Sequence, residues 1–128
     1  MNIPILCLFF SALLLILTKV PVGVAMYLIK GKYDNQNPRE QQSQLTGWGK
    51  RALAAHQNHF EAFPVFAAGV LLTQSLNIHS SRIDHYCLTF IACRILFTIF
   101  YCINWDKLRT LTWFGAYVSS LLLIASGL

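Results

Sequence analysis

The segment RALAAHQNHFEAFPVFAAGVLLTQSL, residues 51–76, changes from polar to apolar after Glu61. On a helix that turns 100° per residue, Arg51, Asn58 and Glu61 lie within about 80° of one another. One stripe therefore carries a cation, an amide and a carboxylate into an apolar environment. A carboxylate there is costly unless a partner or a polar cavity receives it. Glu61 is thus a candidate functional residue, and a polar clasp between helices is the structural alternative.

The composition indicates that this environment is lipid. The chain has 128 residues, of which 55% are hydrophobic and only 12% are charged, whereas soluble domains carry about 25% charged residues. Apolar blocks of about the length that crosses a bilayer as a helix cover residues 3–29, 60–76, 86–103 and 111–128. Continuous apolar runs do not fit the alternating strands of a membrane barrel. The sequence predicts an all-α, integral membrane four-helix bundle, with residues 1–128 forming a single four-span domain.

Local signals predict where these helices begin and bend. No basic side chain precedes the first block, so we expect a retained helix rather than a signal peptide, bent near Pro21. Residues 31–46 are polar and form the largest loop. We expect the second helix to begin near Thr46 or Gly47, Ser80 or Ser81 to cap the third, and Asp106 to cap the fourth.

The net charge of +5 reflects topology rather than nucleic-acid binding. Most cations lie in the first and third connections between the apolar blocks, which share one side of the membrane, and the second connection has only Arg82. This asymmetry predicts that both termini lie outside the cytoplasm. No soluble basic patch with interleaved aromatic residues is present in the sequence to bind nucleic acid. The implied localisation is multi-pass, in a bacterial inner membrane.

The spacing of the cysteines and histidines argues against a disulfide oxidoreductase and against a metal site. The four cysteines lie in apolar blocks and form no Cys-x-x-Cys pair, which argues against a disulfide oxidoreductase. His56 and His59 are three residues apart, but a metal site needs three or four ligands. We therefore predict no metal.

A second polar residue lies in the third apolar block. Arg94 must find a partner inside the membrane, and Glu61 is the obvious acidic candidate. This pair either holds the bundle together or binds a ligand directly. Tyr101 lies two turns further along the same face as Arg94. His59 is expected to be replaceable, because it lies on a different side of its helix from Glu61.

The stretch from Arg51 to Pro64, with its Asn-x-x-Glu-x-x-Pro core, resembles the second helix of the MAPEG family, the membrane-associated proteins in eicosanoid and glutathione metabolism. The four spans and the Arg94–Tyr101 stretch agree with this resemblance, which is strongest to the bacterial branch. The family implies a homotrimer that binds glutathione, as a co-substrate, between subunits near the cytoplasmic side. The matching positions for glutathione binding are Lys30, Arg51, Asn58, Glu61, Arg94 and Tyr101.

The resemblance also implies catalytic roles for Tyr101 and Arg109, in a transferase or peroxidase that acts on lipophilic electrophiles reaching it through membrane lipid. The sequence departs from family glutathione users at Ala54 and Phe97, where they have arginine and tyrosine. The catalytic arginine of the leukotriene-forming branch aligns with Leu108, one residue before Arg109. These departures favour the alternative of a non-enzymatic scaffold that binds lipid or a partner. A small multidrug exporter fits less well, because the first helix has Lys19 and no acidic residue.

Overall fold

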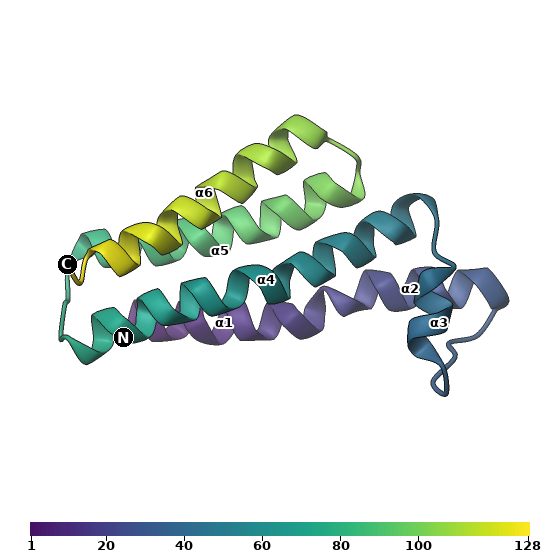
Figure 1. The fold of residues 1–128 in the computed structure, drawn as a ribbon, viewed down its shortest axis with the longest axis horizontal. Coiled ribbons are helices and arrows are strands. Elements are labelled where there is room, and N and C mark those ends of the chain that lie inside the picture. The colour runs from purple at the N-terminus through teal and green to yellow at the C-terminus, as the bar shows by residue number, and fades with distance from the viewer.

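The computed structural model describes residues 1–128 and is entirely helical. Four long helical segments lie side by side, and the first segment is divided into two helices (Figure 1). Both termini lie at one end of the molecule, and the short helix α3 lies near the other end (Figure 1). The elements are α1 (Ile3–Leu17), α2 (Lys19–Lys30), α3 (Pro38–Ser43), α4 (Gly47–Ser75), α5 (Ser81–Cys102) and α6 (Asp106–Ala125).

The first helical segment breaks at Thr18, three residues before Pro21. Pro21 has no N–H group to donate to the carbonyl of Leu17, the last residue of α1, so the helix loses a hydrogen bond there. The Thr18 hydroxyl donates to the Leu14 carbonyl at 2.7 Å and closes the end of α1. The predicted bend near Pro21 is confirmed.

Three of the four predicted spans coincide with helices that are long and apolar enough to cross a membrane: residues 3–30, 81–102 and 106–125. Helix α4 is the longest helix, with 29 residues, or about 43 Å. It does not reach the same apolarity because its first half carries the polar stripe described above. It continues without interruption through Pro64.

The predicted helix starts are correct in two cases and wrong in one. Helix α4 begins at Gly47, and the Ser80 hydroxyl accepts the Ile83 N–H group at the start of α5. Asp106 is not the cap of α6 but its first residue, after Trp105. The chain turns sharply just before, with Asn104 at a φ of 65°, which moves the helix start one residue earlier. Asp106 still faces the positive end of the helix dipole.

Helix α4 lies at the centre of the bundle and packs against α1, α2, α5 and α6. Phe66 on α4 stacks on Phe90 of α5, with ring centroids 3.8 Å apart. At Gly69 the backbone of α4 comes so close to α6 that an added Cβ would lie 2.8 Å from the Leu123 Cβ. These contacts fix how α4, α5 and α6 sit relative to one another, and so position the polar residues that they carry.

The loop that contains α3 is held against the bundle by one buried glutamine, Gln41, which is 2% exposed. Its amide nitrogen donates to the carbonyls of Met26 at 3.1 Å and Lys32 at 2.9 Å, and its oxygen accepts the Asp34 N–H group at 2.9 Å. The side chain thereby joins α3 to the end of α2. The polar loop predicted from the sequence is therefore held in place by these three hydrogen bonds of Gln41, the Gln41 clasp.

Replacing this clasp should loosen the loop without unfolding the bundle. Gln41→Ala removes three hydrogen bonds and leaves buried backbone groups unpaired, so we expect tryptic cleavage at Lys32 and Arg39 to accelerate about tenfold or more. Gln44→Ala is the matched control, because Gln44 is exposed and lies directly after α3. Equal cleavage rates for the two variants would contradict the clasp.

Candidate functional site

The most constrained polar residue is Arg94, in the middle of α5. It is 1% exposed and is among the largest fully buried side chains. The guanidinium carbon lies 4.3 Å from the centre of the Phe97 ring, so one face of the group stacks on an aromatic residue. Of its three nitrogens only Nη1 has a hydrogen-bond partner, and Nε and Nη2 are buried without one. A buried cation with two free donors is a candidate site for an anionic group.

Asn58 connects Arg94 to Glu61. Arg94 Nη1 donates to Asn58 Oδ1 at 3.0 Å, and Asn58 Nδ2 donates to Glu61 Oε2 at 2.8 Å. The prediction that Arg94 pairs directly with Glu61 is therefore corrected: the amide stands between the two charges. The reason is rotational, because Glu61 lies further round α4 and is exposed, whereas Asn58 faces α5.

This cluster opens into a cleft of about 140 Å³ between α4, α5 and α6. Asn58, Glu61 and Arg94 line it from α4 and α5, and Trp113 and Tyr117 line it from α6. The two α6 rings stack at 5.4 Å. The sequence analysis missed the α6 wall, although the spacing of positions 113, 117 and 120 on one helical face is a signal that could have found it.

Tyr101 and Arg109 form a second pair toward the end of α5 that faces the α5–α6 turn. The Arg109 guanidinium lies over the Tyr101 ring at 4.5 Å, and the Tyr101 ring meets Phe97 edge-on at 5.5 Å. Phe97 therefore lies between the two arginines and contacts both Arg94 and Tyr101. Arg109 rather than the aligned Leu108 faces α5, and Leu108 is exposed.

The remaining predicted site residues lie apart from this cleft within one chain. Arg51 donates from Nε and Nη2 to the carbonyl of Cys102, both at 3.3 Å, and so joins the start of α4 to the end of α5. Lys30 is the exposed last residue of α2, and α2 packs mainly on α4. A single chain thus brings together Asn58, Glu61 and Arg94, and separately Tyr101 and Arg109.

His59 has a structural position that the sequence analysis did not predict. It is 3% exposed, and its Nε2 lies 2.7 Å from the Thr98 hydroxyl oxygen. Because that hydroxyl donates to the Arg94 carbonyl at 3.1 Å, His59 acts as the donor to Thr98. The ring also meets Phe97 edge-on. The expectation that His59 is replaceable is not supported, because it packs behind the residues that hold Arg94.

A model of a known protein family matches nearly the whole chain. The family model described as the MAPEG family matches residues 4–128. The chain belongs to the MAPEG family. Together with the three apolar helices, this membership makes it an integral membrane protein. No curated protein and no solved structure matched the chain.

In this MAPEG chain, His59→Ala should lower stability more than Glu61→Ala. The first change leaves a cavity and an unpaired hydroxyl in the α4–α5 contact, with an expected cost of roughly 2–4 kcal/mol. The second removes an exposed carboxylate whose only hydrogen-bond partner is Asn58. Thermal unfolding of both variants in the same mild detergent measures the difference. A Glu61→Ala shift as large as that of His59→Ala would contradict the packing role.

Proposed function

We propose that this MAPEG protein binds glutathione at the cleft between α4, α5 and α6. The observation that carries the proposal is Arg94, which lines the cleft and whose Nε and Nη2 are buried without hydrogen-bond partners. Guanidinium groups bind carboxylates through two parallel hydrogen bonds, and glutathione carries two carboxylates. Glu61, whose Oε2 accepts from Asn58, is suited to receive the ammonium group of the same ligand.

The spacing of the two arginine clusters supports a tripeptide. Arg94 and Tyr101 are seven residues apart on α5, which is about 10 Å along the helix axis. An extended tripeptide covers about the same distance. A ligand held by Arg94 at one end can therefore reach Tyr101 and Arg109 at the other.

Glutathione would supply the reactive thiol, so no nucleophile from the chain is needed. A free thiol has a pKa of about 8.5, and nearby cations lower it and favour the thiolate. Arg109, held over the Tyr101 ring, is the cation that we assign to this role, and the Tyr101 hydroxyl is the donor. The second substrate would be a lipophilic electrophile or peroxide that reaches the cleft from the surrounding lipid.

A homotrimer would complete both the membrane domain and the site. Glu61 is exposed in one chain, and a carboxylate on the surface of a membrane helix is costly against lipid. Covering that face with a second copy removes the cost and allows α4 to serve as a fourth span. A neighbouring subunit could also bring Lys30 to the cleft, which Lys30 of the same chain does not reach.

Charge asymmetry supports an orientation for this assembly. Lys30, Arg51 and Arg109 lie at the end of the bundle opposite to the two termini (Figure 1). Under the positive-inside rule that end faces the cytoplasm. The proposed arrangement is a bacterial inner-membrane protein with both termini outside the cytoplasm and the glutathione site toward the cytoplasmic side.

Calorimetric titration of the purified protein with glutathione tests the binding proposal. Arg94→Met should weaken binding about tenfold or more, because a charge-assisted hydrogen bond contributes roughly 1.5–3 kcal/mol. Arg82→Met is the matched control, since Arg82 is an exposed arginine at the opposite end of the same helix. Tyr101→Phe should reduce the rate of conjugation to a lipophilic aryl halide more than it reduces affinity.

The competing function is a scaffold of the same fold that binds lipid or a partner. The observation that favours it is Phe97, which is 3% exposed and already covers one face of the Arg94 guanidinium. If the wild-type protein binds no glutathione at millimolar concentration, the enzymatic proposal fails and the scaffold replaces it.

Native mass spectrometry in mild detergent tests the assembly. We expect trimers for the wild-type protein. Glu61→Lys, which places a cation on the covered face, should shift the population to monomers, whereas Glu40→Lys should not, because Glu40 is an exposed residue of α3. Only monomers or dimers of the wild-type protein would contradict the trimer.

A further inference from the structure

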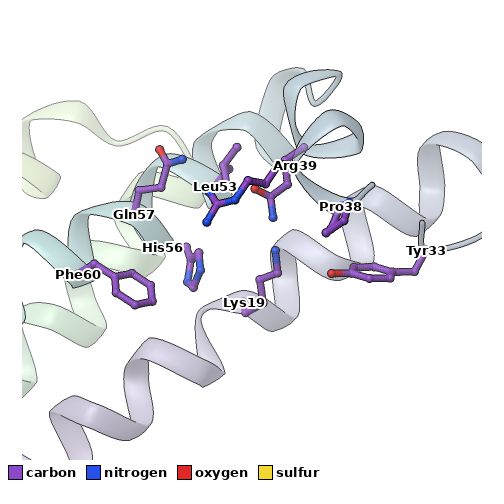
Figure 2. Close-up of a pocket in the computed structure, with 9 residues that line it drawn as sticks. Lys19, Tyr33, Pro38, Arg39, Leu53, His56, Gln57 and Phe60 are labelled. Carbon is purple, nitrogen blue, oxygen red and sulfur yellow. The ribbon is translucent and has the colours of Figure 1, made fainter. Parts of the chain in front are cut away.

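A second cavity of the molecule is larger than the Arg94 cleft. It has a volume of about 420 Å³ and lies where the α1–α2 break, the loop with α3 and the first half of α4 meet. Figure 2 shows Lys19 and Tyr33 on one side of the cavity, His56 and Phe60 on the other, and Arg39 across the top. No role was predicted for Lys19 or His56 from the sequence.

The cavity lies on a different side of α4 from the proposed glutathione site. Its α4 residues are at positions 53, 56, 57 and 60, whereas those of the Arg94 cleft are at 58, 61 and 62. The centres of these two sets are separated by roughly 145° around the helix. Within one chain the two sites therefore do not share a wall residue.

The chemistry of the lining favours an anion. Lys19 and Arg39 contribute two positive charges, and the other polar groups are the Tyr33 phenol, the His56 imidazole and the amides of Gln42 and Gln57. No carboxylate lines the cavity. Two cations that face one cavity without an acidic residue leave a net positive charge to be neutralised by a ligand.

Fixed contacts position both sides of the cavity. On the α4 side, the His56 Nδ1 lies 2.9 Å from the Thr18 hydroxyl oxygen, and that hydroxyl donates to Leu14. The imidazole is thereby tied to the helix break that ends directly before Lys19. On the loop side, the Gln41 clasp holds the helix that carries Arg39. Ordered elements therefore fix the backbone from which each cation extends.

The lining is polar on the side of the loop and partly apolar on the side of α4. This combination favours an anion that also has an apolar part. Arg39 and Tyr33 come from the polar loop, whereas Leu53 and Phe60 come from α4, and Phe60 is 52% exposed. Val20, next to Lys19, is 60% exposed. A cationic pocket with an exposed apolar edge, in a chain that lies in lipid, matches a phosphate with an acyl chain attached.

We propose that this cavity binds the phosphate of an anionic phospholipid, with Lys19 and Arg39 on the headgroup and the acyl chains lying along Phe60. The lipid would fill the space between α4 and the break that separates α1 from α2, beneath the loop that contains α3. This role is independent of glutathione binding, because it uses the opposite side of α4.

Native mass spectrometry of the full chain, with phosphatidylglycerol added to a neutral detergent, tests the site. Lys19→Met and Arg39→Met should each lower the affinity about fivefold, as expected for one cation near an anionic headgroup. Lys50→Met is the matched control, because Lys50 is exposed at the same end but does not line the cavity; it should change affinity less than twofold. Arg39 is exposed, so its replacement does not endanger folding.

Three further measurements identify the ligand. Phosphatidylcholine should bind at least fivefold more weakly than phosphatidylglycerol, and equal affinity would overturn the anion site. Inorganic phosphate alone should bind far more weakly than the lipid, and equal affinity would overturn the lipid assignment. Saturating glutathione should leave lipid binding to the wild-type protein unchanged, and competition between the two ligands would show a single shared site. If Lys50→Met lowers the affinity for phosphatidylglycerol as much as Lys19→Met does, the lipid is attracted by the general surface charge, and the proposed site is wrong.

Discussion

The rest of the structure depends on the burial of one guanidinium group in an apolar bundle. An isolated charge in such a place is costly, and it persists only where hydrogen bonds and aromatic faces surround it. Arg94 meets Phe97 on one face and Asn58 at one nitrogen. The backbone carbonyl of Arg94 is in turn tied through Thr98 to His59. The contact between α4 and α5 is therefore arranged around this residue as much as around apolar packing.

This constraint links the fold to the proposed binding site. The close approach of α4 to α6 at Gly69 and the stacking of Phe66 on Phe90 bring three helices to one cleft. The cleft is small, yet it is lined by Arg94, a fully buried residue whose Nε and Nη2 have no hydrogen-bond partner. A membrane protein that kept this cation only for stability would be expected to satisfy all its nitrogens. The same reasoning distinguishes Arg94 from Arg51, whose donors are used on the Cys102 carbonyl.

Helix α4 separates two polar regions of different character. One side carries an amide and a carboxylate toward Arg94, and the other side faces Lys19 and Arg39 across a larger cavity without a carboxylate. At about 43 Å, α4 is longer than the bilayer core of about 30 Å. Its first turns can therefore extend toward the interface, where the loop of α3 lies. Four of the polar residues that lower its apolarity line these regions: His56, Gln57, Asn58 and Glu61.

The sequence by itself determined the helical class, the apolar spans, the start of α4 at Gly47 and the bend before Pro21, because these depend on composition, periodicity and missing backbone donors. It also placed Asn58, Glu61 and Arg94 in one candidate site, since polar residues in apolar runs are few. Only the tertiary structure decided that Asn58 stands between the two charges, that His59 is buried and that Trp113 and Tyr117 form the third wall. It likewise revealed the Lys19 cavity, whose lining comes from segments up to 41 positions apart, from residue 19 to residue 60. Side-chain direction and the approach of distant helices depend on packing, and no local pattern in one helix contains that information.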